Sequence, residues 1–190
     1  MAAFQAAHEH VRIVLAECWS EEAVRHIRSG ETDLGVVVEG CDVAGLWCRP
    51  YRSDRLAAVL NDDEALGGDS VAFTDLLDRD LVGLEGGSTL TRLLTAQAAQ
   101  QMRPMALRVQ VRSFEAVCRA VQARLGVGIL PLAAAHSFAH DMRLKVLPLA
   151  DPWALRRMQL CARSQPAAQT PLDTLVAHLE RCANAGSAAG

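Results

Sequence analysis

The chain has 190 residues, of which 51% are hydrophobic and only 4% aromatic, so a folded core would consist mainly of aliphatic side chains. The net charge of −3 lacks the basic excess of a nucleic-acid-binding module, and no apolar run is long enough to span a membrane. The opening sequence does not resemble a signal peptide, and the six cysteines form no CxxC motif. We therefore expect a cytoplasmic protein with reduced thiols.

The first third of the chain alternates apolar runs typical of strands with an amphipathic helix. Ser20 is predicted to be the N-cap of this helix, and Gly30 is expected to end it. The continuous apolar run DLGVVV at 33–38 is typical of a buried parallel strand. The other expected elements are the end of a helix at 2–9, a strand at 11–17, an irregular stretch at 40–50 and a strand at 55–61.

The stretch from Val109 to Pro131 carries the sharpest local signals, in the order strand, helix, strand. Its first three residues alternate in polarity, and Ser113 offers a side-chain oxygen at the position of a helix N-cap. Gly126 and Gly128 are expected to end the helix and lead into a short buried strand that Pro131 stops. The predicted apolar stripe of the helix consists of Phe114, Val117, Cys118, Val121 and Leu125.

Strands and helices also alternate in the rest of the chain, with short connections. This alternation is typical of parallel sheets with right-handed crossovers. The remaining predicted elements are a helix at 73–79, a strand at 81–85, a helix at 89–101, a helix at 131–138, strands at 144–149 and 155–162, a helix that starts at Thr170 and Pro171, and a frayed tail from Asn184.

The order of elements predicts an α/β fold of two Rossmann-like lobes. Lobe one is expected to comprise residues 1–61 and 149–184, and lobe two residues 62–148, followed by a disordered tail at 185–190. The chain would cross between the lobes near 60–63 and near 147–151, and the cleft between the lobes would be the binding site.

The segment GGSTLTRLL at 86–94 follows a predicted strand and opens a predicted helix. Free backbone N–H groups at such a helix start, with the hydroxyls of Ser88 and Thr89, can hold a carboxylate or phosphate, although Ser88 could equally be a simple helix cap. The segment is neither a P-loop nor a dinucleotide fingerprint. Arg112 could reach an anionic ligand or lie on the surface, and Phe114 could line a pocket or pack in the core.

Metal and catalytic motifs are not evident. His136 and His140 stand four residues apart, but the glutamate of an HExxH motif is missing. The acidic run 62–64 is interpreted as a solvated turn, and Cys118 and Cys161 as core residues. We expect no metal, no cofactor and no enzymatic activity.

Four runs in this order resemble the effector-binding domain of LysR-type transcriptional regulators: SGETDLGVV, RLAAVL, DLVGLEGGSTLTRLL and VRSFEAVCRAVQARLGVGILP. The resemblance covers about residues 2–179. It implies a fold like that of the type 2 periplasmic binding proteins, with two α/β lobes, a two-strand hinge and an effector cleft. The effector-binding residues that it implies are Ser20, Val38, Gly87, Ser88, Thr89, Ser113 and Phe114.

The resemblance also implies an antiparallel, side-by-side homodimer or a tetramer. Several family members carry a basic residue at the position of Val38, so this pocket is expected to hold an acidic effector less strongly or to bind a less polar one. The interface would use the helix at 2–9, the strand at 11–15 and the helix at 89–101. The implied interface residues are Phe4, Ala7, Arg12, Val14, Leu93, Gln97 and Gln101.

A full family member begins with a winged helix-turn-helix DNA-binding domain, a linker helix and the first strand of the effector domain. Met1 here falls within the expected first helix of lobe one. We therefore expect the N-terminal strand of lobe one to be missing, this lobe to be weakened, and DNA to be contacted only through the missing domain.

The leading hypothesis is a small-molecule effector-sensing and dimerisation domain of a LysR-type DNA-binding regulator, with an organic acid as the candidate effector. It would act by population shift, through different effector affinities for two arrangements. The alternative is a solute-binding protein of a transport system with the same fold, which would be exported and monomeric. An enzyme of the same architecture is a third class, but no catalytic constellation favours it.

Overall fold

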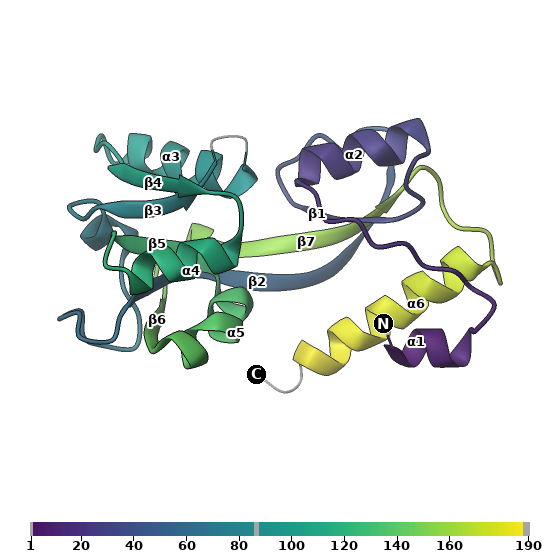
Figure 1. The fold of residues 1–190 in the computed structure, drawn as a ribbon. Coiled ribbons are helices and arrows are strands. Elements are labelled where there is room, and N and C mark those ends of the chain that lie inside the picture. Colours follow the sequence, from purple (N-terminus) through teal and green to yellow (C-terminus); the bar gives the residue numbers. More distant parts are fainter. Residues whose placement is uncertain (1, 86–87, 188–190) are drawn as a thin grey trace. The chain divides into compact units, whose positions relative to one another are not determined.

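The structure is a computed structural model that describes residues 2–85 and 88–187. It divides into unit 1, residues 1–53 and 157–190, and unit 2, residues 54–156. The chain passes between the units within two strands, β2 (Trp47–Asn61) and β7 (Leu155–Ala162), which are labelled in Figure 1. The predicted lobe boundaries at 61/62 and 148/149 fall inside unit 2.

Unit 1 places an amphipathic helix over a short strand. The helix α2 (Ser20–Ser29) buries Val24 and Ile27 and ends at Gly30, which adopts a left-handed φ of 82°. The strand β1 (Gly35–Val38) pairs antiparallel with β7, so the expected parallel pairing of this run is wrong. The other helices of unit 1 are α1 (Ala2–Ala7) and α6 (Pro171–Ser187).

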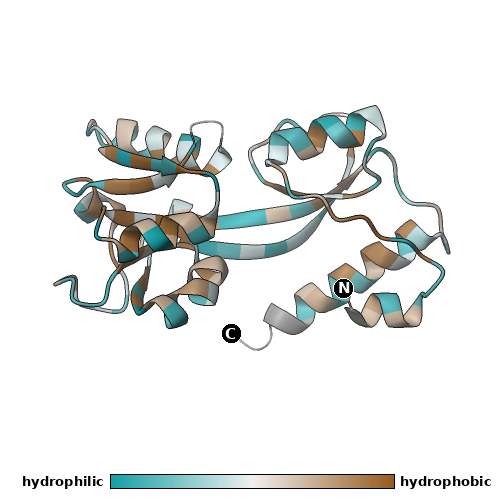
Figure 2. Cartoon of the chain, viewed as in Figure 1, coloured by the Kyte–Doolittle hydropathy of each residue, from teal (hydrophilic) through white to brown (hydrophobic). Residues whose placement is uncertain are grey.

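The predicted strand at 11–17 is not formed. Residues 11–19 form neither strand nor helix, and the residues Val14 and Leu15 are 77% and 78% exposed. Figure 2 shows this apolar run between α1 and α2 in brown. β-Branched residues favour extended backbone, but a strand also needs a partner for its ladder of hydrogen bonds. No described strand pairs with this run.

Two boundary predictions in unit 1 are also wrong. The stretch expected to be irregular at 40–50 ends before Trp47, because β2 begins there and is 15 residues long instead of starting at Arg55. The tail expected to fray from Asn184 remains helical to Ser187, and 188–190 lie outside the described residues.

Unit 2 is built on a mixed sheet. Its strands follow the order β2–β5–β3–β4, with β6 paired to the other edge of β2. β3 pairs parallel with β4 and β5, whereas β2 pairs antiparallel with β5 and β6, so the predicted all-parallel sheet is only partly confirmed. The bounds are β3 (Leu81–Leu84), β4 (Leu107–Val111), β5 (Val127–Pro131) and β6 (Leu144–Pro148).

Helices pack on this sheet through apolar faces. The cap prediction at Ser113 is confirmed, because its hydroxyl oxygen accepts a hydrogen bond from the Ala116 N–H at 3.2 Å. The helix that follows ends before Leu125, which is 40% exposed and does not extend the stripe. The helices of unit 2 are α3 (Thr89–Gln100), α4 (Phe114–Gln122) and α5 (Leu132–Met142), with 3-10 turns η1 (Phe73–Leu76) and η2 (Pro152–Ala154).

The core of unit 2 includes the contact of α4 with strands β2 and β5. A Cβ at Gly128 would stand 2.7 Å from Cγ1 of Val117, so this glycine allows α4 to approach the sheet closely. Val117, which makes this contact, and its neighbour Cys118 are both fully buried. No described helix is long and apolar enough to cross a membrane.

Candidate functional site

The carboxyl ends of the parallel strands β3 and β4 position the candidate site. Leu84 pairs with Val111 at these ends, so Glu85 and Arg112 follow side by side. The chain then enters α3 after β3 and α4 after β4. Ligands of open α/β sheets bind at such strand ends. We call this region of unit 2 the helix-start site: the starts of α3 and α4, with Ser88, Thr89, Ser113 and Phe114.

Ser88 fixes the start of α3. Its side chain is fully buried, and its hydroxyl oxygen accepts a hydrogen bond from the Thr91 N–H at 3.2 Å. The Thr91 hydroxyl in turn donates to the Leu84 carbonyl at 2.8 Å, which ties the helix to the end of β3. Ser88 is therefore a helix cap, and this bond holds the first turn in place around the candidate site.

Thr89 differs from its neighbours because its hydroxyl oxygen is buried and has no hydrogen-bond partner among the described residues. A buried hydroxyl without a partner costs about 1 to 3 kcal/mol. Thr89 is also the first residue of α3, where backbone N–H groups lack partners within the helix. Hydroxyl and amide donors at a helix start together suit a carboxylate or a phosphate.

The start of α4 adds a charged pair and an aromatic side chain. Arg112 Nε lies 2.8 Å from Glu85 Oε1, and both side chains are exposed. The hydrogen bond to Glu85 raises the pKa of Arg112. Ser113 is exposed, and Phe114 is half-buried against the core of unit 2. Arg112 is therefore a surface residue with an acidic partner, as one of the two interpretations of the sequence expected.

Two predicted effector-binding residues come together in unit 1. The Val38 N–H donates a hydrogen bond to the Ser20 hydroxyl oxygen at 3.2 Å, which links the end of β1 to the start of α2. The N-cap position of α2 is Trp19, so the prediction that Ser20 caps this helix is wrong. The reason is that Ser20 is the first helical residue and its hydroxyl oxygen accepts from the neighbouring strand. Gly87, a further predicted site residue, lies outside the described residues.

The residues predicted for a dimer interface differ in exposure. Phe4 is 1% exposed, and its ring centroid lies 4.5 Å from that of His8 and 5.3 Å from that of His178. The Phe4 side chain therefore packs inside unit 1. Ala7, Arg12 and Val14 are exposed, Leu93 and Gln97 are half-buried on α3, and Gln101 follows the end of that helix.

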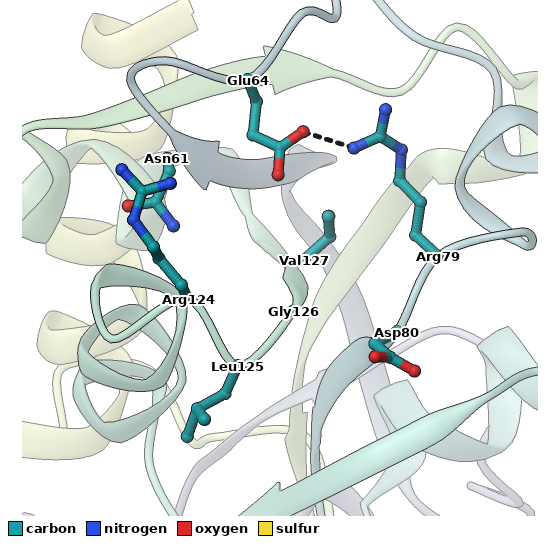
Figure 3. Close-up of a pocket in the computed structure, with 8 residues that line it drawn as sticks. All are labelled: Asn61, Glu64, Arg79, Asp80, Arg124, Leu125, Gly126 and Val127. Carbon is teal, nitrogen blue, oxygen red and sulfur yellow. Dashed lines mark hydrogen bonds and ion pairs between the residues drawn. The ribbon is translucent and has the colours of Figure 1, made fainter.

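A cavity of about 250 Å³ lies at the opposite end of the parallel strands, before the amino ends of β3 and β5 (Figure 3). Sequence reasoning did not find it, because the acidic run 62–64 was interpreted as a solvated turn. A second hollow of about 360 Å³ shares Asn61 and Arg124 with it. The lining residues of the first cavity are Asn61, Glu64, Arg79, Asp80, Arg124, Leu125, Gly126 and Val127.

Each charged side chain that lines this cavity has an oppositely charged partner. Arg79 Nη1 lies 2.5 Å from Glu64 Oε2, the pair that Figure 3 joins by a dashed line. Arg124 Nη2 lies 2.6 Å from Asp63 Oδ2, and its hydrogen bond lowers the pKa of Asp63. An anion would have to displace a carboxylate from each arginine, so the helix-start site is the better candidate. We call the first cavity, of about 250 Å³, the paired-charge cavity.

The described part of the chain holds no group of three His, Cys, Asp or Glu side chains placed to bind a metal ion. His136 and His140 both lie exposed on α5.

Two α/β units connected by two strands, with helix starts at strand ends, define a fold like that of the type 2 periplasmic binding proteins. Residues 1–183 match the LysR substrate binding domain family, and the chain belongs to this family. This membership favours the effector-binding domain of a LysR-type regulator over the solute-binding protein of a transport system. Comparison with curated proteins found no significant match.

Solved structures of similar fold include the regulatory domain of Synechocystis PCC6803 CcmR in complex with 2-PG. It is 19% identical, with a TM-score of 0.85, and the match covers 96% of this chain and 88% of that chain. The BenM effector-binding domain with its effector benzoate is 17% identical, at a TM-score of 0.81, with coverage of 98% and 85%. The QuiR effector-binding domain with shikimate is 18% identical, at a TM-score of 0.79, with coverage of 96% and 88%. At these identities the likeness concerns the fold.

Proposed function

We propose that this chain senses a small organic acid through the helix-start site, as the regulatory domain of a LysR-type transcriptional regulator. The observation that carries the proposal is the buried Thr89 hydroxyl, which lacks a partner among the described residues at the start of α3. Benzoate and shikimate, which the similar BenM and QuiR domains bind, are both carboxylates. A carboxylate at this position would accept hydrogen bonds from the hydroxyl and from first-turn amides.

The fixed geometry of α3 favours anion binding in this proposal. Ser88 holds the first turn through its bond to Thr91, so little ordering is left for the binding step. The partial positive charge of the helix N-terminus adds about 0.3 to 1 kcal/mol for an exposed anion. Phe114, half-buried at the start of α4, would contact the apolar part of the effector. The predicted contributions of Ser20, Val38, Gly87 and Ser113 remain predictions.

The response that we propose is a shift between two arrangements of the regulator that differ in effector affinity. The chain would act without enzymatic activity and in the cytoplasm. It would assemble as a homodimer or tetramer, and DNA would be bound by a separate domain of the regulator.

The exposed apolar side chains of Val14 and Leu15 support a contact with another copy near this segment. Arg12 and Gln97 belong to the same predicted interface.

A thermal-shift experiment with benzoate, shikimate and 2-PG tests the proposal. A ligand at about 100 times its Kd stabilises a protein by about 2.7 kcal/mol. For a chain of this size that raises Tm by about 5 to 10 °C. Neutral benzamide is the control ligand. Thermal shifts that are equal for acids and for benzamide would contradict an anion-binding site.

A pair of matched variants then tests the residue. Thr89→Val removes the unpartnered hydroxyl, and we expect it to weaken binding of the acid about 10-fold, since one hydrogen bond to a charged group contributes about 1.5 kcal/mol. Thr95→Val is the control, because the Thr95 hydroxyl lies on the same helix and donates to the Thr91 carbonyl at 2.9 Å. Equal affinities of the two variants would argue against the role of Thr89.

A further inference from the structure

Two cysteines of unit 1 lie in direct contact, although 113 residues separate them in the sequence. Cys48 Sγ stands 3.0 Å from Cys161 Sγ. The first is on β2 and the second on β7, which are neighbouring strands. The strands run in opposite directions, because Asp54 of β2 pairs with Arg156 of β7 while the earlier Cys48 pairs with the later Cys161. The thiols therefore form a cross-strand pair.

The surroundings of this pair differ on its two sides. Cys161 is fully buried and packs with Val24, Ile27 and Val37. Cys48 is half-buried at the rim of the same cluster, so this residue is more open to solvent than Cys161. Burial, followed by the hydrogen bond with Cys48, raises the pKa of Cys161. A third thiol, Cys41, also packs against this cluster.

We propose that Cys48 and Cys161 form a site of reversible oxidation, at which a peroxide converts the two thiols into a disulfide between β2 and β7. The side chains already face each other on adjacent strands. The bond needs the sulfurs to approach from 3.0 Å to about 2.05 Å. This site involves unit 1 alone and does not depend on the proposed effector.

The chemistry balances with hydrogen peroxide as the oxidant. The Cys48 thiolate attacks one peroxide oxygen, so an S–O bond forms, the O–O bond breaks, and the leaving hydroxide takes a proton to become water. The Cys161 thiolate then attacks the sulfur of the Cys48 sulfenic acid. An S–S bond forms, the S–O bond breaks, and a second water leaves. The two thiols together lose two electrons and two protons, and the peroxide is reduced to two waters.

Cys48 reacts with the peroxide first, because the raised pKa of Cys161 keeps the Cys161 thiol mostly protonated. The later attack of Cys161 on the sulfenic acid is intramolecular, which offsets its low fraction of thiolate. The disulfide would close a loop of more than 100 residues, and such a loop strongly restricts the unfolded chain. We therefore expect oxidation to raise Tm by about 10 °C.

The test is peptide mapping of the whole chain after treatment with hydrogen peroxide, followed by alkylation in denaturant and digestion. We expect one cross-linked peptide that joins Cys48 to Cys161, with a mass two hydrogens below the sum of the two reduced peptides. The other four of the six cysteines should still be alkylated. Dithiothreitol should restore the fully reduced protein. Cys48→Ser should abolish the cross-link, while Cys182→Ser, at an exposed position on α6, should leave it unchanged.

A second variant tests the order of attack without needing the cross-link. In Cys161→Ala the sulfenic acid on Cys48 should persist and be trapped by dimedone. Three outcomes would overturn the proposal: six alkylated cysteines after peroxide, a cross-link that joins Cys41 in the unsubstituted chain, or dimedone-trapped sulfenic acid confined to cysteines other than Cys48 in Cys161→Ala.

Discussion

Gly126→Ala should be among the most destabilising single substitutions in unit 2. Gly126 precedes β5 and adopts a φ of +146°, which L-residues rarely occupy. An added Cβ would stand 2.4 Å from the Asp80 carbonyl oxygen, which is backbone and cannot move aside alone. The same oxygen accepts a hydrogen bond from the buried Val127 N–H at 2.9 Å. Relief of the clash therefore weakens the contact between β3 and β5.

The expected loss combines two terms. Backbone strain at a disfavoured φ costs about 1 to 3 kcal/mol, and a buried amide left without its acceptor costs about 1 to 3 kcal/mol. Their combined effect is about 4 kcal/mol in the free energy of unfolding. For a chain of this length the melting temperature should fall by about 10 °C.

Thermal and urea unfolding, followed by far-ultraviolet circular dichroism, measure this loss. Gly67→Ala is the matched control, because a Cβ there meets no atom within 4 Å. We expect this control to stay within about 0.5 kcal/mol of the unsubstituted chain. If Gly126→Ala melted within about 2 °C of Gly67→Ala, neither φ nor close approach at Gly126 would constrain the stability of unit 2.

Two further predictions concern groups away from the candidate site. Asp54→Asn removes the negative charge of a largely buried, two-bonded pair with Arg156, at 2.9 and 2.7 Å, and should lower the free energy of unfolding by about 3 kcal/mol in urea titrations, since the Arg156 charge stays buried without its counter-charge; a loss below about 0.5 kcal/mol would show that the pair does not stabilise the fold. Burial raises the pKa of Cys118 to about 11, whereas an ordinary cysteine thiol titrates at about 8.5. The difference in thiolate ultraviolet absorbance between the unsubstituted chain and Cys118→Ala should therefore stay small up to about pH 10, and a difference that is complete by about pH 10 would show an ordinary thiol.

Local chemistry explains which elements could be predicted from the sequence. The stretch 109–131 folds largely as expected, because Ser113 caps its helix and because Gly126 and Gly128 meet requirements set by φ and by close packing. Each of these signals acts within a few residues of the chain. The two-unit α/β architecture likewise follows from the alternation of elements, and the family match agrees with it.

The errors arise where a partner distant in sequence decides the outcome. The run 11–17 has strand-like residues, but no described strand pairs with it. Ser20 has the right chemistry for a cap, yet its hydroxyl oxygen accepts from Val38, 18 residues away. The contact between Cys48 and Cys161 depends on the pairing of β2 with β7, which no local spacing of cysteines reveals.

The candidate site was predicted in part. The segment 86–94 indicated a helix start with hydroxyl groups, and the structure confirms the cap role of Ser88. That the Thr89 hydroxyl is buried without a partner among the described residues could not be predicted, because it depends on how α3 packs against the sheet. The paired-charge cavity was missed for the same reason, since Arg79 and Glu64 meet only in the folded unit.

Anion binding at the start of α3 is tested most directly by a titration of the isotope-labelled chain with benzoate, shikimate or 2-PG, monitored by amide chemical shifts in two-dimensional NMR. We expect the largest saturable shifts at the amides of Thr89 and Leu90, in the first turn of α3. Largest shifts around Arg79 and Arg124, with those of α3 unchanged, would place the ligand in the paired-charge cavity and contradict the proposed site.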